Sequence, residues 1–378
     1  MRGLILSGPG EIEVRTDLPE PEVTADHDAI IAVELAGLCG SDLHPYAGRE
    51  PFLSGMIPGH ELVGTILEAG DALGAFQPGD RVFAPFTTSC GACHPCRREL
   101  SSRCSSGEFL GLLLPEGAAG EPTGGGLNGA QAERVRVPLA DTTLLPLPKL
   151  SGLPSGGGDA SVPELTAILL ADNFTTGWFA AEGALGVRID EASTLDSKKS
   201  VAVVGCGAVG LAAISAARSL GAKGVIAIDP VAERREIAAS LGAEALSPDA
   251  AIARIGGTPE AGRVEAVIEA VGNPAAQSMA VQLLLPGGTL MSVGVHNPPF
   301  GITPADLYDG NLTYRAGRAP VKSILDRILP AIESGRITVP ADAMISDPRV
   351  PLSEGPDAYR RFSERAEGVR KIVFDPTE

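Results

Sequence analysis

The sequence predicts an α/β protein with a β-rich domain and a second domain built on a doubly wound parallel sheet. Its 378 residues favour two domains. Short runs rich in Val, Ile and Leu, separated by Gly and Pro, fill the first part of the chain, which is typical of β structure. From about residue 200 to 295, strand patterns alternate with helix patterns instead. We expect the β-rich domain over 1–171, the parallel-sheet domain over 172–304, and a segment over 305–378 that returns to the first domain because it is too small to fold alone.

In the first domain, three short runs rich in Val, Ile and Leu predict strands: Ala29–Leu35, Leu62–Glu68 and Arg134–Pro138. Two other stretches, Leu114–Asn128 and Pro148–Val162, are dominated by Gly, Pro, Ser and Ala and have no hydrophobic period. We expect both to be insertions that form long surface loops.

The second domain contains four runs that are typical of buried parallel strands. They are Val201–Val204, Val225–Asp229, Val264–Ala270 and Thr289–Val293. In the C-terminal segment, the pattern predicts a helix over Ser323–Ser334 and a strand over Lys371–Phe374.

The charge balance disfavours some classes of partner. The chain has 30 basic and 47 acidic residues, a formal net charge of −17 and no basic patch, so we expect no binding to nucleic acid. The apolar stretch Val201–Ile228 carries Arg218 and Lys223 and is broken by glycines, so we expect no membrane span. The first ten residues lack the apolar region of a signal peptide, and we therefore expect a cytoplasmic protein, where clustered cysteines are more often metal ligands than disulfides.

A glycine pattern predicts a dinucleotide site at the start of the second domain. Gly205, Gly207 and Gly210 follow a strand and open a helix. The first permits a tight turn, the second lets the backbone approach a pyrophosphate, and the third lets helix and strand pack closely. The free N–H groups at the helix N-terminus would bind the phosphates.

The next strand ends in Asp229, 19 residues after the last glycine of the pattern. A carboxylate there accepts hydrogen bonds from the adenosine ribose diol and repels a 2′-phosphate, which favours NAD over NADP. Arg234 and Arg235 leave NADP open, because either could reach a 2′-phosphate.

Four cysteines follow one another closely in the first domain, at Cys90, Cys93, Cys96 and Cys104. Four thiolates within fifteen residues can surround one tetrahedral Zn²⁺ and leave no position for water, so the spacing predicts a structural zinc site. A redox switch or an iron–sulfur cluster is the alternative.

A second group of potential ligands precedes this cluster. Cys39 is followed by Ser41, Asp42 and His44, and His60-Glu61 comes about twenty residues after the cysteine. A Cys, a His and nearby carboxylates are the ingredients of an open zinc site, although two unrelated turns would give the same residues.

The order of these motifs resembles that of the zinc-dependent medium-chain dehydrogenases/reductases, the alcohol dehydrogenase superfamily. The resemblance runs from Cys39 through His60 and the four-cysteine cluster to the glycine pattern, and so covers nearly the whole chain. It implies a GroES-like β-rich catalytic domain and a Rossmann domain. The stretches Gln131–Pro138 and Leu170–Asp172 are similar to the formaldehyde-dehydrogenase/dismutase-like branch, in which an Asp replaces the third zinc ligand.

On this resemblance, Cys39, His60 and Asp172 hold a catalytic zinc, with water or substrate in the fourth position. A helix N-cap is the alternative role for Asp172. The resemblance also places Asp42 behind the imidazole of His60, and Glu61 beside the zinc, able to exchange onto it.

The resemblance further implies a proton route and one more cofactor contact. The hydroxyl of Ser41 would pass the alcohol proton towards His44, which would release it to solvent. Arg370 matches a tail position that reaches the pyrophosphate in relatives.

The predicted function is therefore hydride transfer between NAD(H) and an alcohol and its aldehyde or ketone, with two zinc ions per chain. We expect a small-molecule substrate and a homodimer or homotetramer. Two alternatives use other readings of the same residues: an NADPH-dependent biosynthetic reductase or aldehyde dismutase, and a non-catalytic binding protein on an inherited fold.

Overall fold

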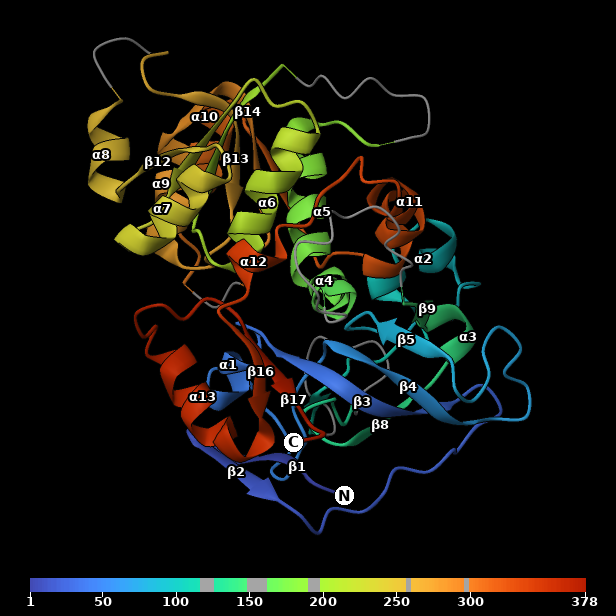
Figure 1. The fold of residues 1–378 in the computed structure, drawn as a ribbon. Helices are drawn as coiled ribbons and strands as arrows, with labels where there is room; N and C mark the ends of the chain where they lie inside the picture. Colours follow the sequence, from blue (N-terminus) through green and yellow to red (C-terminus); the bar gives the residue numbers. More distant parts are fainter. Residues whose placement is uncertain (116–125, 148–161, 190–197, 256–259, 296–298) are drawn as a thin grey trace. The chain divides into compact units, whose positions relative to one another are not determined.

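The structure is a computed structural model, and it describes residues 1–115, 126–147, 162–189, 198–255, 260–295 and 299–378. The chain divides into two compact units (Figure 1). The first unit comprises 1–172, 320–336 and 345–378, and the second comprises 173–319 and 337–344. Each unit is described by itself below.

The first unit is built around a mixed sheet that, within the described residues, has seven strands. The strand order is β16-β17-β3-β4-β5-β9, and β8 also pairs with β3. Alternate apolar side chains of these strands, such as Ile31 and Val33 of β3, enter one core cluster. The strands are β3 (Ala29–Leu38), β4 (Leu62–Ala69), β5 (Arg81–Ala84), β8 (Arg134–Val137), β9 (Leu145–Pro146), β16 (Asp347–Pro351) and β17 (Ile372–Asp375).

The last strand of the chain completes this sheet beside one of the first. β17 runs antiparallel to β3, with Ile372 opposite Leu38 and Val373 opposite Gly37. The smaller elements of the unit lie around the sheet. They are the hairpin β1 (Gly3–Gly8) and β2 (Glu11–Arg15), the pair β6 (Leu112–Leu113) and β7 (Gly126–Leu127), and the helices α1 (Leu43–Tyr46), α2 (His94–Arg97), η1 (Ser101–Arg103), α3 (Ala140–Thr143), α4 (Val162–Ala171), α11 (Val321–Glu333), η2 (Leu352–Glu354) and α13 (Gly355–Ser363).

The second unit contains a parallel sheet of six strands among the described residues, in the order β12-β11-β10-β13-β14-β15. The chain moves outward from β10 in one direction and then returns to continue from β13 in the other, which makes the sheet doubly wound. The strands are β10 (Ser200–Val204), β11 (Gly224–Ile228), β12 (Glu244–Leu246), β13 (Val264–Glu269), β14 (Leu284–Ser292) and β15 (Thr313–Ala316).

Helices connect these parallel strands, as crossovers require. Residues of α8, α9 and α10 share a core with the strands, whereas α5 packs along α6 (Figure 1). The helices are α5 (Asn173–Leu185), α6 (Ala208–Ser219), α7 (Ala232–Ser240), α8 (Pro248–Ala253), α9 (Pro274–Gln282), α10 (Pro304–Asp309) and α12 (Ala341–Met344).

The structure differs from the expected boundaries in the C-terminal segment. We expected the whole of 305–378 to return to the first domain, but 305–319 and 337–344 belong to the second unit. The reason is that β15 hydrogen-bonds in parallel to β14 and so extends the Rossmann sheet. Asp172, expected to open the second domain, belongs to the first unit.

The two expected insertions lie mostly outside the described residues. Of Leu114–Asn128, the structure describes the ends, where Gly126–Leu127 forms β7. Of Pro148–Val162, it describes only the last residue, which opens α4. In the described part of the chain, no helix combines the length and the apolar character needed to span a membrane.

Candidate functional site

Cys39 and His60 are brought together by neighbouring strands of the first unit. Cys39 follows the end of β3, and His60 precedes β4, which pairs with β3. Asp42 fixes both residues, since one of its carboxylate oxygens accepts a hydrogen bond from the backbone N–H of Cys39 at 2.8 Å and the other lies 3.3 Å from Nδ1 of His60. A proton on Nδ1 leaves Nε2 of His60 as the free donor atom for a metal.

Asp172 joins these two residues in a buried cluster. The Sγ atom of Cys39 donates to Oδ2 of Asp172 at 3.1 Å, and Nε2 of His60 lies 3.5 Å from the same oxygen. Glu61 completes the group: one donor atom from each of the four residues lies within 4.8 Å of the others, and all four residues are buried. These are ligand types and spacings that suit Zn²⁺.

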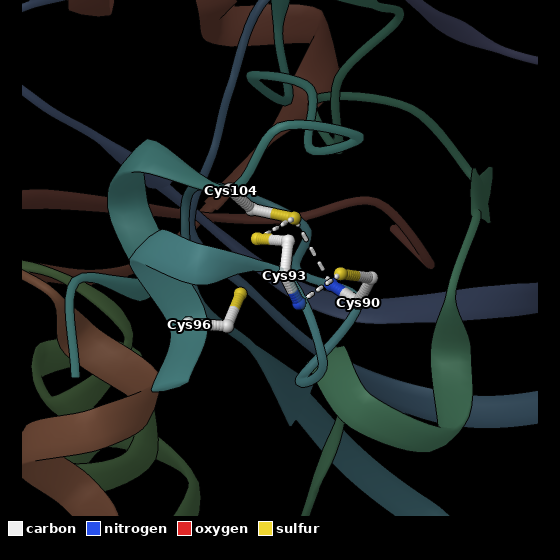
Figure 2. A group of neighbouring side chains, drawn as sticks. All are labelled: Cys90, Cys93, Cys96 and Cys104. Carbon is white, nitrogen blue, oxygen red and sulfur yellow. Dashed lines mark hydrogen bonds between the residues drawn. The ribbon is translucent and has the colours of Figure 1, made fainter. Parts of the chain in front are cut away.

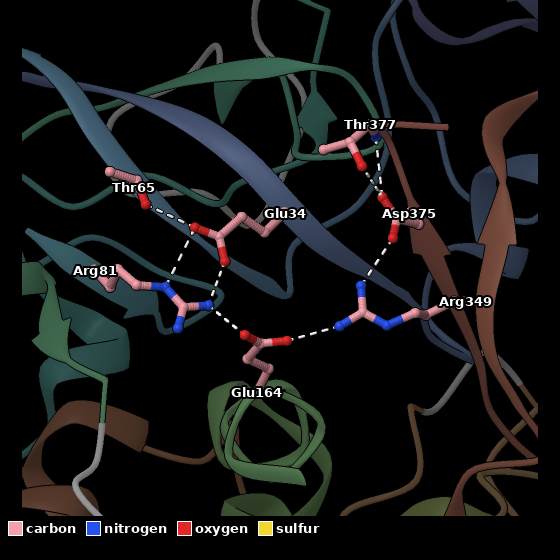
Figure 3. A network of polar contacts seen from close by, with 7 residues as sticks. All are labelled: Glu34, Thr65, Arg81, Glu164, Arg349, Asp375 and Thr377. Atoms are coloured by element: carbon pink, nitrogen blue, oxygen red, sulfur yellow. Dashed lines mark hydrogen bonds and ion pairs between the residues drawn. The ribbon is translucent and has the colours of Figure 1, made fainter. Parts of the chain in front are cut away.

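The helix that precedes Asp172 is anchored to the sheet by an ion network (Figure 3). Glu164, in the first turn of α4, pairs with Arg81 of β5 and, at 2.7 Å, with Arg349 of β16. Arg349 also pairs with Asp375 of β17 at 2.8 Å. Because α4 ends at Ala171, this anchoring sets where the next residue, Asp172, enters the cluster.

Glu61 has a partner that the sequence analysis did not select. The Nζ atom of Lys371 donates to Oε1 and Oε2 of Glu61 at 2.6 and 2.5 Å, and to the carbonyl oxygen of Leu38 at 3.1 Å. The side chains of the pair are 1% and 0% exposed. Removing one partner of such a buried pair typically costs about 3–5 kcal/mol. The available signal was a lysine at the head of an apolar terminal strand, where a charge requires a partner.

The electrostatics of the cluster favour a cation. Burial lowers the pKa of His60, but the charge of Asp42 and hydrogen bonds to carboxylates raise this pKa well above its usual range. Burial opposes ionisation of Asp172, but hydrogen bonding and charge from His60 hold its pKa well below the usual range. Burial and the charge of Asp172 raise the pKa of the Cys39 thiol. A divalent cation fits here because it would replace the imidazolium charge and ionise the thiol.

Of the expected proton route, Ser41 precedes α1 and His44 lies within it. The hydroxyl of Ser41 is 3.2 Å from Nε2 of His60, beside the atom that would bind a metal. The Nδ1 atom of His44 lies 3.8 Å from a carboxylate oxygen of Glu50. Burial, assisted by the charge of Arg49, lowers the pKa of His44 to about 4, so its imidazole is neutral at pH 7.

The four-cysteine cluster lies in a lobe of the same unit, around α2 and η1 (Figure 2). One Sγ atom from each cysteine lies within 4.8 Å of the others, and all four cysteines are free thiols. Backbone N–H groups point at the sulfurs, from Cys90 to Cys104 at 3.2 Å and from Cys93 to Cys90 at 3.3 Å.

Hydrogen bonds from the backbone around Cys96 and Ser105 lower the pKa of the Cys93 thiol to about 6. Burial and the neighbouring thiols raise the pKa of Cys96 to about 12. One thiolate therefore forms readily, whereas ionising all four thiols requires a cation among them. The arrangement fits a closed, structural zinc site.

The glycine turn of the second unit has the geometry of a dinucleotide-binding loop. Gly205 has φ +94°, which a residue with a side chain rarely adopts. A Cβ atom on Gly210 would lie 1.8 Å from the carbonyl oxygen of Gly205, so helix and strand could not pack as they do. A Cβ atom on Gly207, the N-cap of α6, would meet nothing within 4 Å, and this open space is where a phosphate could approach.

Asp229 lies at the end of β11 and is held by the backbone. Its carboxylate oxygens accept hydrogen bonds from the N–H groups of Cys206 and Val231, each at 2.8 Å. Arg235 donates to the carbonyl oxygens of Asp229 and Pro230, also at 2.8 Å.

The other two arginines selected for the cofactor are placed differently. Arg234 is in α7, partly exposed. Arg370 belongs to the first unit, where its backbone N–H donates to Ser346 and its guanidinium to the carbonyl oxygen of Gly368.

Comparison with known proteins gives the family. The alcohol dehydrogenase GroES-like domain matches residues 25–149, and the zinc-binding dehydrogenase domain matches residues 208–319. A zinc-type alcohol dehydrogenase B of Aspergillus flavus is 34% identical over 100% of this chain and 82% of its own length. The chain belongs to the zinc-dependent alcohol dehydrogenase family. It is accordingly a zinc-dependent oxidoreductase that acts on alcohols or aldehydes, and the expected GroES-like and Rossmann folds are confirmed.

Solved structures of this alcohol dehydrogenase family superpose on the whole chain. An alcohol dehydrogenase from Thermus sp. ATN1 has a TM-score of 0.82 and 34% identity, and 99% of each chain is covered. A zinc-binding dehydrogenase from Sinorhizobium meliloti, bound to NADP, has a TM-score of 0.75 and 26% identity, with 99% of each chain covered. A glutathione-independent formaldehyde dehydrogenase of Pseudomonas aeruginosa is 34% identical over 72% of this chain and 65% of its own length, so the closer branch stays a prediction.

Proposed function

We propose that this chain oxidises an alcohol to its aldehyde or ketone, or catalyses the reverse, with NAD as the hydride carrier and a zinc ion held by Cys39, His60 and Asp172. The observation that supports this most strongly is the convergence of these three residues in one buried cluster. The reaction converts alcohol and NAD⁺ to carbonyl compound, NADH and a proton. Zinc, when bound, supplies a Lewis acid that stabilises an alkoxide.

The protein's own residues orient the ligands and move the proton. Asp42 holds the imidazole of His60 with Nε2 towards the metal position. The hydroxyl of Ser41, 3.2 Å from that nitrogen, lies where it can accept the proton of a bound alcohol and pass on its own. His44 is the proposed final relay residue: with a pKa of about 4 it is neutral at pH 7, so it can pass a proton on to solvent but does not retain it.

A second zinc ion, at Cys90, Cys93, Cys96 and Cys104, has a structural role in this proposal. The two ligand sets share no residue. We therefore propose two zinc ions per chain, in a homodimer or homotetramer located in the cytoplasm.

The test is elemental analysis combined with NADH fluorescence on a panel of alcohols and aldehydes. The intact protein should contain two zinc ions and show turnover with NAD⁺. Cys39→Ser should reduce the zinc content to one and abolish turnover, and Cys206→Ser, which changes a buried cysteine outside both clusters, should keep both zinc ions. Unchanged zinc content in Cys39→Ser would contradict the catalytic site.

The preference for NAD rests on Asp229, and it has a separate test. A carboxylate opposite a 2′-phosphate disfavours NADP, so Asp229→Gly, alone or with Pro230→Arg, should shift the ratio of kcat/KM values towards NADP by about tenfold or more. Asp229→Asn is the matched control, because it removes the charge and keeps one oxygen that can accept the backbone hydrogen bonds. If Asp229→Gly and Asp229→Asn both keep the parent protein's ratio of kcat/KM values for NAD and NADP, Asp229 does not contact the ribose. The NADPH-dependent alternative, with Arg234 as the phosphate contact, then gains support.

A further inference from the structure

The cluster around Cys39 contains one donor more than an open zinc site needs. Cys39, His60, Glu61 and Asp172 together could fill all four positions of a tetrahedral ion, which would make the site closed and structural. A catalytic zinc site has three protein ligands and one free position. For the site to stay open, Glu61 must therefore be kept from binding the metal as a fourth ligand.

Lys371 is the residue that binds the carboxylate of Glu61. Its Nζ atom is within 2.6 Å of both carboxylate oxygens of Glu61 and 3.1 Å from the carbonyl oxygen of Leu38. The lysine cannot easily move, because it directly precedes β17, where Ile372 lies opposite Leu38 in the sheet. Both side chains are buried, so no water competes for the pair.

A glycine makes room for the carboxylate in this position. A Cβ atom on Gly37 would lie 1.8 Å from Oε2 of Glu61, so any larger residue at 37 would displace the carboxylate. Gly37 is also opposite Val373 in the pairing of β3 with β17. The carboxylate of Glu61 thus lies against Gly37 of β3 and is bound by Lys371, which precedes β17, the strand that pairs with β3.

The charges agree with this arrangement. Glu61 and Lys371 neutralise each other, which leaves one thiolate and one carboxylate to balance a divalent ion. With Lys371 removed, the carboxylate of Glu61 would be buried without its cation, and a nearby metal ion would be the strongest available partner.

We propose that Lys371 is a positioning residue that holds Glu61 away from the metal, so that a cluster with four protein donors keeps one position open for substrate. This inference rests on the proposed zinc site. In this proposal, the residue just before the C-terminal strand determines whether the metal site is open or closed.

The experiment uses Co²⁺-substituted full-length protein and neutral imidazole at pH 8 as the probe of the open position. In the parent protein, imidazole should change the visible cobalt spectrum, because imidazole can bind at the open fourth position of the buried cluster. The four-cysteine cluster has no open position and should not respond. Lys371→Met should weaken this response by about tenfold or more, because Glu61 then occupies the position. The double variant Glu61→Gln/Lys371→Met should regain the response, since residue 61 then has no carboxylate to occupy the fourth position.

Two outcomes would overturn the proposal: a Lys371→Met titration that overlays that of the parent protein, or a double variant that stays unresponsive. If Lys371→Met does not fold, Gly37→Ala is tested in its place. This variant keeps the lysine but displaces the carboxylate of Glu61 from its position beside residue 37. An imidazole response equal to that of the parent protein would then refute the proposal. A parent protein that shows no imidazole response at all would instead refute the proposed open zinc site.

Discussion

The two potential metal clusters of the first unit contain the same number of donors and are built in opposite ways. The cysteine cluster is local, since Cys90 and Cys104 are 14 positions apart, and three of its four residues are partly exposed. The other cluster is assembled across the fold: Cys39 and Asp172 are 133 positions apart, and all four residues are buried. Lys371, 310 positions from Glu61, pairs with a donor of the second cluster only.

With the roles proposed above, donor number alone does not separate a structural site from a catalytic one. In the cysteine cluster, every donor is a thiol with other thiols as neighbours, and only a metal can balance them all. In the buried cluster, Asp42 pairs with His60 and Lys371 pairs with Glu61. These two pairings determine which donor atoms remain for a metal. The following predictions test this difference, from the largest expected effect to the smallest.

Replacing a ligand of the buried cluster should abolish activity. His60→Gln should lower turnover by at least about a thousandfold and reduce zinc from two ions to one, because it removes a ligand needed for Lewis-acid catalysis. Steady-state kinetics and elemental analysis measure both effects. His27→Gln, which changes an exposed histidine paired with Asp141, should alter neither.

Replacing a ligand of the cysteine cluster should mainly lower stability. Cys93→Ser should also reduce zinc to one ion, but it should lower the free energy of unfolding by on the order of 4 kcal/mol, because a structural metal contributes directly to folding. Thermal and denaturant unfolding measure this loss. Should Cys93→Ser lose activity without losing stability, the assignment of the two clusters would be reversed.

The proposed proton route involves only the buried cluster. His44→Gln should keep both zinc ions and slow alcohol oxidation by about tenfold or less, because water can partly replace a terminal base. Since burial lowers the pKa of His44 to about 4, the parent imidazole stays neutral from pH 5 to 8, and the deficit should be nearly independent of pH over that range. A pH–rate profile that matches the parent protein would exclude His44 from the route.

The same pKa shift has a consequence for stability. The folded protein binds the His44 proton less readily than the unfolded chain, so the group costs stability as pH falls from about 6.5 towards 4. His44→Gln removes this cost, and the variant should therefore lose less stability than the parent protein between pH 7 and pH 5. Urea unfolding at the two pH values measures the difference.

The smallest effect is expected at the anchor of α4. Glu164→Gln should speed zinc release from the buried cluster a few-fold, because α4 then holds Asp172 less firmly, and should leave the cysteine cluster unchanged. Release to a chromophoric chelator measures both rates. Glu364→Gln, which breaks an exposed pair with Arg360, is the matched control; if it has the same effect on zinc release, the anchor has no specific role.

The features that were predictable from the sequence are those that neighbouring residues form by themselves. The spacing of Cys90, Cys93, Cys96 and Cys104 brings four sulfurs together over a short chain segment, and the structure places them as expected. The glycine turn is also local, and its positive φ at Gly205 follows from residue type. The strands beginning at Ala29, Leu62 and Arg134 are predictable from runs rich in Val, Ile and Leu; in the last of these, only Val135 and Val137 are buried.

Other features depended on contacts that no short segment encodes. Arg370 was selected from the resemblance, whereas the residue in contact with the buried cluster is its neighbour Lys371. The extent of the second unit was misjudged because β15 joins the parallel sheet by backbone hydrogen bonds, which leave little trace in side-chain composition. The proximity of Asp172 to Cys39 was available only by resemblance to a family.

The sequence by itself therefore determined the fold class, the cysteine cluster and the glycine turn, because each depends on local spacing or on the periodicity of apolar residues. Only the tertiary structure decided that Asp172 and Lys371 meet the residues near Cys39. The pairing of β17 with β3 places Lys371 beside Leu38 and hence beside Glu61. The packing of α4 on the sheet places Asp172, the next residue, in the cluster with Cys39. A register between strands separated by hundreds of residues is fixed by backbone hydrogen bonds and a shared core, and these exist only once the chain has folded.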